Sequence, residues 1–67
     1  MSVLAVVKKE NKKEGVWVVR PLTPTGEAFY TVRPEDFDYD DIAVNDLVDL
    51  YIENPNRASR HGAKAQS

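Results

Sequence analysis

The sequence predicts an all-β fold: a small, partly open barrel of five short strands with one short helical turn. Segments rich in valine and aromatic residues fit strands, prolines and glycines separate them, and no long stretch shows the period of a helix. The 67 residues make one domain at most, and closure into a barrel removes exposed strand edges. The chain has no cysteine for a disulfide, and its single histidine, His61, cannot build a zinc site alone.

Two valine-rich segments predict the first two strands. Residues 3–7 form the longest apolar run, far shorter than the roughly 20 residues that span a membrane. Residues 8–15 carry four lysines and end in Gly15, which predicts a charged hairpin tip with a left-handed turn or a bulge. In the second strand, residues 16–20, Arg20 shares its face with Val16 and Val18. Trp17 and Val19 are therefore expected to face the core.

The third strand, residues 28–33, is predicted to end at Pro34. If Phe29 lies in the core, strand alternation turns Tyr30 outward, where it can stack on a base or fill an interface pocket. Pro34 and the two acidic residues after it suit the first turn of a short helix, and Phe37 is then expected to return to the core.

Residues 46–53 show the clearest two-residue alternation in the chain, with Val48, Leu50 and Ile52 on one face of a fourth strand. Residues 57–67 contain no large apolar side chain. We therefore expect a barrel core over residues 1–55 and a weak last strand or flexible basic tail over residues 56–67. If the tail leaves the barrel open, the unpaired edge makes strand-to-strand dimerisation an option.

Charge is strongly partitioned, although the net charge is only −2. Residues 34–53 contain eight acidic residues and no basic one. Residues 1–33 contain six Lys/Arg against three Glu, and residues 54–67 contain three Lys/Arg and no acid. The acidic segment has three interpretations: a divalent-cation site, a surface that faces a protein or mimics nucleic acid, and ordinary surface charge beside a helical turn. The spacing of a calcium-binding EF-hand loop is absent.

In pattern and spacing the chain resembles the cold-shock domain and related small OB-fold barrels. Glu14-Gly15-Val16-Trp17-Val18-Val19 is similar to the second-strand motif of that family, and Phe29-Tyr30-Thr31-Val32 falls where its third-strand motif lies. Residues 45–53, Asn-Asp-Leu-Val-Asp-Leu-Tyr-Ile-Glu, resemble its fourth strand, and Gly62-Ala63-Lys64-Ala65 is similar to the start of its last strand. The resemblance implies a five-stranded OB-like barrel that binds single-stranded RNA or DNA.

The chain departs from the family where bases are stacked. Its first strand has no aromatic residue, and Lys8 and Lys9 lie near that place. Valines occupy the two stacking positions of the second strand, Trp17 is one residue out of step, and Val32 replaces a histidine in the third strand. One step along a strand reverses the face, so the barrel can exist without the full stacking platform.

We therefore expect a binding module for single-stranded nucleic acid, in which Lys and Arg contact phosphates and stacking is limited. The candidate residues come from the first three predicted strands and the basic hairpin: Lys8, Lys9, Lys13, Trp17, Val18, Arg20, Tyr30 and Arg33. The alternative is a protein-interaction or regulatory module, of phage or mobile-element origin, that uses the acidic surface. No catalytic constellation is present, so we expect no enzyme, no cofactor and no metal. We also expect a cytoplasmic monomer or weak dimer that does not contact a membrane.

Overall fold

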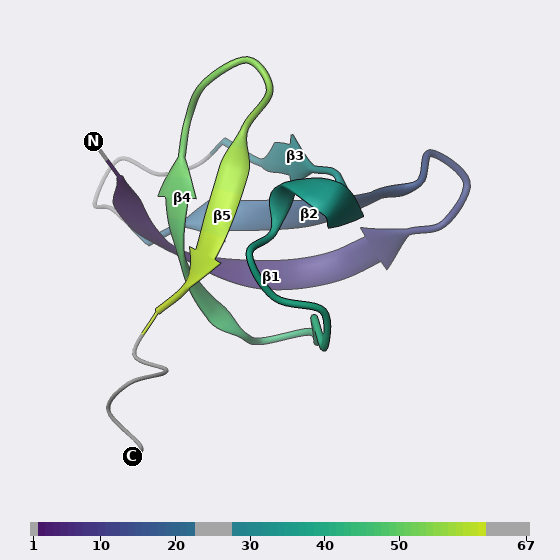
Figure 1. The fold of residues 1–67 in the computed structure, drawn as a ribbon, viewed down its shortest axis with the longest axis horizontal. Coiled ribbons are helices and arrows are strands. Elements are labelled where there is room, and N and C mark those ends of the chain that lie inside the picture. The colour runs from purple at the N-terminus through teal and green to yellow at the C-terminus, as the bar shows by residue number, and fades with distance from the viewer. Residues whose placement is uncertain (1, 23–27, 62–67) are drawn as a thin grey trace.

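The computed structural model describes residues 2–22 and 28–61 of the chain. It confirms the all-β prediction: five strands and one short helical turn make a curled half-barrel (Figure 1). The elements in chain order are β1 (Val3–Asn11), β2 (Val16–Pro21), β3 (Tyr30–Val32), the 3-10 turn η1 (Pro34–Asp36), β4 (Leu47–Tyr51) and β5 (Arg57–Arg60).

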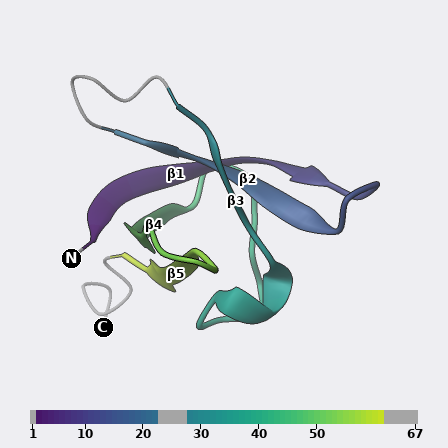
Figure 2. The same ribbon diagram turned by 90° about the horizontal axis from the view of Figure 1, so that it is seen from above.

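The five strands form one antiparallel sheet in the order β3-β2-β1-β4-β5. The long strand β1 pairs with β2 on one side and with β4 on the other, so it joins the two ends of the sheet (Figure 1). Figure 2 shows β1, β2 and β3 on one side of the molecule and β4, β5 and the η1 segment on the other. The sheet therefore has an inner face that encloses the core and an outer face that is open to solvent.

The core fills the inner face. Its buried side chains come from all five strands and from the segment after η1: Ala5, Val7, Val19, Val32, Phe37, Val48, Leu50 and Ala58. Burying one valine or leucine side chain stabilises a fold by about 1.5–3 kcal/mol, so these few residues provide most of the apolar stabilisation in so short a chain. Phe37 returns to the core after η1, as predicted, and its ring meets Trp17 and Tyr39 edge-on.

The alternation predicted for β2 and β4 is confirmed, except at the end of β4. Val19 is buried and Trp17 packs against the core, while Arg20 is exposed. Val48 and Leu50 are buried, but Ile52 is 47% exposed, so the prediction that it shares their face of the strand is wrong. The reason is that β4 ends at Tyr51 and the chain then turns through the segment before β5.

The prediction for the third strand is wrong about its two faces. Phe29 is 60% exposed, whereas Tyr30 is half-buried and packs against the core. Val32 lies opposite Trp17 in the pairing of β2 with β3 and is buried. Because Tyr30 is two residues from Val32, it shares the inner face, and Phe29 falls on the outer face.

The predicted hairpin tip is too long, because β1 continues to Asn11 and only residues 12–15 form the turn. Gly15 has φ +72°, the left-handed conformation expected of it, and its N–H donates to the carbonyl of Asn11 at 2.8 Å. The register of β1 against β2 shifts between Val7 and Lys9, so β1 carries a bulge at Lys8 rather than at the glycine.

The last strand is present as β5, and Ala58 at its centre is buried against Leu50 of β4. The outer edge of β5 is covered by the segment after η1. Phe37 forms a parallel bridge with Ala58, and the N–H of Asp38 donates to the Ala58 carbonyl at 3.1 Å. The residues compared with the family's last strand, 62–65, lie outside the described residues.

Candidate nucleic-acid interface

A hollow on the outer face of the sheet combines lysines with apolar side chains. It has a volume of about 520 Å³ and is lined by Lys8, Lys9, Asn11, Val18 and Phe29. β1 supplies the lysines and the asparagine, β2 supplies the valine, and the residue just before β3 supplies the phenylalanine. Side chains from two neighbouring strands and from the residue before a third therefore meet in a hollow that combines apolar and positively charged groups.

The bulge in β1 explains why two consecutive lysines line the same hollow. Val7 pairs with Val19 on the inner face, and Lys9 pairs with Val18 on the outer face, which leaves Lys8 as the extra residue between them. In a regular strand, neighbouring side chains point to opposite faces, but a bulge adds one residue and redirects its side chain. The sequence Lys-Lys therefore becomes a pair of cations on one side of the sheet.

The backbone next to the bulge is held from the side of β4. The N–H of Val7 donates to the carbonyl of Asp46 at 2.9 Å, and the Val7 carbonyl accepts from the N–H of Asn45 at 2.7 Å. Asn45 has φ +79°, a left-handed conformation that asparagine adopts more readily than most residues. The position of the lysine pair is thus fixed by contacts with a segment nearly 40 residues away in sequence.

The hairpin lysines differ from Arg33, Arg57 and Arg60, each of which contacts a carboxylate of the acidic segment. Within residues 2–22 and 28–61, none of Lys8, Lys9, Lys12 and Lys13 forms an ion pair. All four are exposed. Exposed cations without an internal partner are available to an anionic ligand, and the hollow places two of them beside apolar surface.

In the acidic segment, residues 34–53, carboxylates do form ion pairs within the chain. Arg33 contacts Glu35 at 3.5 Å and Asp36 at 3.1 Å, and Arg57 contacts Glu53 at 3.5 Å. His61 Nδ1 lies 3.0 Å from a carboxylate oxygen of Asp49.

Contacts from the region of β5 reach the remaining part of the acidic segment. The Arg60 guanidinium pairs with Asp41 and lies 4.1 Å from the centre of the Tyr39 ring, and the Arg60 N–H donates to Asp38 at 3.1 Å. Of the eight acidic residues in 34–53, only Asp40 has a carboxylate without a hydrogen-bond or ion-pair partner among the described residues. Most carboxylates of the acidic segment are therefore engaged in contacts within the chain.

Asp46 organises the loop that precedes β4. One of its carboxylate oxygens accepts hydrogen bonds from the Tyr39 hydroxyl and the Ala43 N–H, each at 2.9 Å. Burial of the phenol, together with its hydrogen bond to the Asp46 carboxylate, raises the pKa of Tyr39 above its ordinary value of 10.0. Tyr39 is therefore a neutral structural group and not an acid or base for chemistry near neutral pH.

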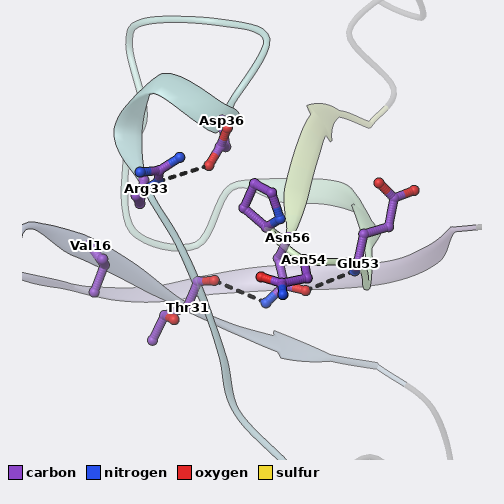
Figure 3. Close-up of a pocket in the computed structure, with 8 residues that line it drawn as sticks. Val16, Thr31, Arg33, Asp36, Glu53, Asn54 and Asn56 are labelled. Carbon is purple, nitrogen blue, oxygen red and sulfur yellow. Dashed lines mark hydrogen bonds and ion pairs between the residues drawn. The ribbon is translucent and has the colours of Figure 1, made fainter.

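A second hollow of about 290 Å³ lies where β3 faces the turn between β4 and β5 (Figure 3). Asn56 spans it: its amide donates to the Thr31 carbonyl at 3.1 Å, and its side-chain oxygen accepts from the Glu53 N–H at 2.9 Å. This asparagine ties the turn to the free edge of β3. The lining mixes both signs of charge with neutral groups: Val16, Thr31, Arg33, Asp36, Glu53, Asn54, Pro55 and Asn56.

The structure brings three of the eight candidate residues together, because Lys8, Lys9 and Val18 line the first hollow. Arg20 lies on the same outer face, opposite Val6 of β1, and Lys13 is exposed in the hairpin turn.

The other three candidates lie elsewhere. Trp17 and Tyr30 face the core, and Arg33 lines the second hollow, where two carboxylates contact it. Sequence reasoning missed Phe29 and Asn11 as lining residues. The signal for Phe29 was strand alternation. Once Val32 is placed on the inner face, Phe29, three residues earlier, falls on the outer face.

No group of three or more His, Cys, Asp or Glu side chains in the described part of the chain could hold a metal ion. Over the same residues, no helix has the length and apolar character to cross a membrane. Comparisons of the chain with protein-family models, with curated proteins and with solved structures found no match.

Proposed function

We propose that this protein binds single-stranded nucleic acid on the outer face of β1, β2 and β3. The observation that carries the proposal is the hollow in which Lys8 and Lys9 stand beside Val18 and the exposed ring of Phe29. Lysines contact phosphates and release the counterions around them. An exposed aromatic ring provides a surface on which an unpaired base can stack, a contact worth about 1–3 kcal/mol per base.

The arrangement favours a single strand over a duplex. In a duplex the faces of the bases are already stacked on one another, whereas in a single strand they are free to contact Phe29 and Val18. The strand order β3-β2-β1-β4-β5 also supports the finer proposal that the half-barrel is of the OB type, which binds oligonucleotides on its second and third strands. Phe29 would then supply the stacking group that the sequence pattern places on Tyr30.

The alternative of a protein-binding acidic surface has less support. Seven of the eight carboxylates in residues 34–53 already have partners within the chain, so most of that segment is occupied by structural contacts. The lysines of the hairpin keep their positive charge available. This difference makes an anionic ligand the better choice.

The test is the binding of fluorescently labelled oligo(dT) and oligo(rU), measured by anisotropy over a series of salt concentrations. Each phosphate contact in a single strand contributes about 0.7 to the slope of log K against log[salt]. We expect Lys8→Ala/Lys9→Ala to reduce this slope by about 1.4, and Phe29→Ala to weaken binding by about 5- to 150-fold, the equivalent of one stacked base.

The matched control is Lys12→Ala/Lys13→Ala, which removes the same charge from the turn of the same hairpin. We expect a smaller loss of affinity in this variant, because its lysines lie outside the hollow. Equal losses of affinity in the two double variants would show that binding depends on the total positive charge of the hairpin and not on the hollow. No binding of either oligonucleotide at low salt would contradict the proposal.

A further inference from the structure

The second hollow adjoins the first across two pairs of facing residues. Asn11 of β1 pairs with Val16 of β2, and Val18 of β2 pairs with Thr31 of β3. In each pair one residue lines the hollow that holds the lysines, and the other lines the second hollow. Directly opposed side chains of an antiparallel pair lie on the same face, with their Cβ atoms about 4.5–5.5 Å apart. The two hollows are therefore neighbouring parts of one surface on the outer face of the sheet.

The two hollows differ in charge. Lys8 and Lys9 line the first, and no carboxylate joins them among the described residues. The second is lined by one cation, Arg33, and by the carboxylates of Asp36 and Glu53. Phosphate is therefore favoured in the first hollow and disfavoured in the second. A single strand that lies across both places its phosphates beside the lysines and a base in the second hollow.

The turn between β4 and β5 supplies the hydrogen-bonding groups of the second hollow (Figure 3). Asn54 is exposed, and within residues 2–22 and 28–61 its side-chain amide has no partner. The Glu53 carboxylate lies 3.5 Å from Arg57 through Oε1, and over the same residues Oε2 has no partner. Asn56 holds this turn, because its side chain accepts from the Glu53 N–H and donates to the Thr31 carbonyl. A carboxylate oxygen and a carboxamide are thus available on one fixed turn.

The other two charged groups of the second hollow are less available. The Asp36 side chain is only 14% exposed, and its Oδ2 lies 3.1 Å from Arg33 Nε. Arg33 also contacts Glu35 at 3.5 Å. These residues therefore shape the charge of the hollow, and the groups that can contact a base are those of Glu53 and Asn54.

These two side chains match the hydrogen-bonding edge of cytosine and of adenine. In both bases an amino group, which donates, stands beside a ring nitrogen that accepts. A carboxylate only accepts, so Glu53 pairs with the amino group, and the Asn54 amide can donate to the ring nitrogen. Uracil has a carbonyl and a ring N–H in the corresponding places, and its carbonyl turns a lone pair toward the carboxylate. Val16 and Pro55 add apolar contact for the ring of the base.

We propose that the second hollow is a base-binding subsite that takes an amino-bearing base, cytosine or adenine, in preference to uracil. Glu53 and Asn54 determine this preference. The subsite rests on the single-stranded nucleic-acid binding proposed above, because Arg33, the cation that lines the second hollow, is already paired with two carboxylates. The lysines of the first hollow hold the phosphates of any strand, and the second hollow selects the base.

The test compares labelled oligo(rC) and oligo(rU) of equal length by fluorescence anisotropy at neutral pH. The two probes carry the same backbone and the same number of phosphates, and their bases are nearly equal in size. The ratio of their dissociation constants therefore reports the choice of base. We expect the wild-type chain to bind oligo(rC) at least about fivefold more tightly, the effect of one hydrogen-bonded base contact.

Two variants assign this preference to the second hollow. Asn54→Ala is expected to bring the ratio of dissociation constants toward one and to leave the slope of log K against log[salt] unchanged, because no phosphate contact is lost. Glu53→Gln is expected to move the ratio toward uracil, because the new amide can donate to the uracil carbonyl. Both positions are exposed, and urea unfolding verifies that the variants are folded.

Glu14→Gln is the matched control for Glu53→Gln, because it removes the same charge from the hairpin turn, outside the second hollow. We expect it to strengthen the binding of both probes equally and to keep their ratio. A preference for oligo(rC) that survives both Asn54→Ala and Glu53→Gln would overturn the proposal.

The wild-type chain separates failure of the subsite from failure of the proposed function. Binding of both probes with equal affinity would overturn the subsite alone. Binding of neither probe at low salt would overturn the nucleic-acid interface and the subsite together.

Discussion

The acidic segment, residues 34–53, and the basic hairpin, residues 8–13, differ in what their charges contact. Carboxylates of the acidic segment meet arginines, a tyrosine and a histidine of the same chain, and these contacts hold the η1 segment and β5 in place. The hairpin lysines meet no carboxylate within the described residues. A high local charge therefore predicts a binding surface only where the fold leaves that charge without a partner.

The largest expected difference between the two regions is in stability, and it is seen by comparing their two phenylalanines. Phe37→Ala removes a buried ring that packs between Trp17 and Tyr39, at an expected cost of about 3–5 kcal/mol, enough to unfold most of the population of so small a domain. Phe29→Ala is expected to change the free energy of unfolding by about 0.5 kcal/mol or less, because that ring is exposed. Urea unfolding followed by Trp17 fluorescence measures both. Equal costs would contradict the assignment of faces.

The next effect tests whether carboxylates of the acidic segment are structural. Asp46→Ala leaves the Tyr39 hydroxyl and the Ala43 N–H without their acceptor, and we expect a loss of about 1–3 kcal/mol in the free energy of unfolding. Lys9→Ala removes a charge of the opposite sign from the hairpin and is expected to cost about 0.5 kcal/mol or less. Urea midpoints of the two variants measure the contrast, and a stable Asp46→Ala protein would refute it.

Alkaline pH sharpens the comparison at Tyr39. Its pKa in the folded chain is raised above 10.0 by burial and by Asp46, so the unfolded chain loses this proton first. The stability from this group is complete below pH 10.0 and is lost as pH rises from there toward the folded pKa. The melting temperature of the wild type should therefore fall more steeply above pH 10.0 than the melting temperature of Tyr39→Phe. Parallel pH profiles for the two proteins would contradict this.

The smallest expected effect concerns two neighbouring aspartates. Asp41→Asn breaks the ion pair with Arg60, and because both groups are well exposed we expect a loss of about 1 kcal/mol or less that salt reduces further. Asp40→Asn is expected to show no loss, because Asp40 has no side-chain partner among the described residues. Chemical unfolding at low and high salt measures the pair, and identical behaviour of the two variants at low salt would contradict the assigned contact.

Sequence alone predicted the parts of the fold that local alternation determines. Val48 and Leu50 in β4, and Trp17 and Val19 in β2, follow a two-residue period against polar neighbours, and all four face the core. The third strand gave no such period, because Phe29, Tyr30 and Val32 are all apolar or aromatic. Its inner face is determined by pairing with β2, which is a contact distant in sequence.

The candidate site was predicted in part for the same reason. Lys8 and Lys9 were recognisable as cations near the first strand, but the bulge that places both in one hollow depends on backbone contacts with Asn45 and Asp46. The partners of the acidic segment likewise come from distant residues such as Arg60. A sequence pattern shows which charges exist, and the tertiary structure decides which of them remain available.

The most direct test of this account is an NMR titration of the isotopically labelled protein with a short single-stranded oligonucleotide at low salt. We predict that the backbone amides of Lys8, Lys9, Val18 and Phe29 shift first, while those of residues 35–46 stay in place because their carboxylates repel phosphate and most are held within the chain. Shifts centred on residues 35–46, or none at millimolar protein, would contradict the claim that the hairpin lysines, and not the acidic segment, form the binding surface.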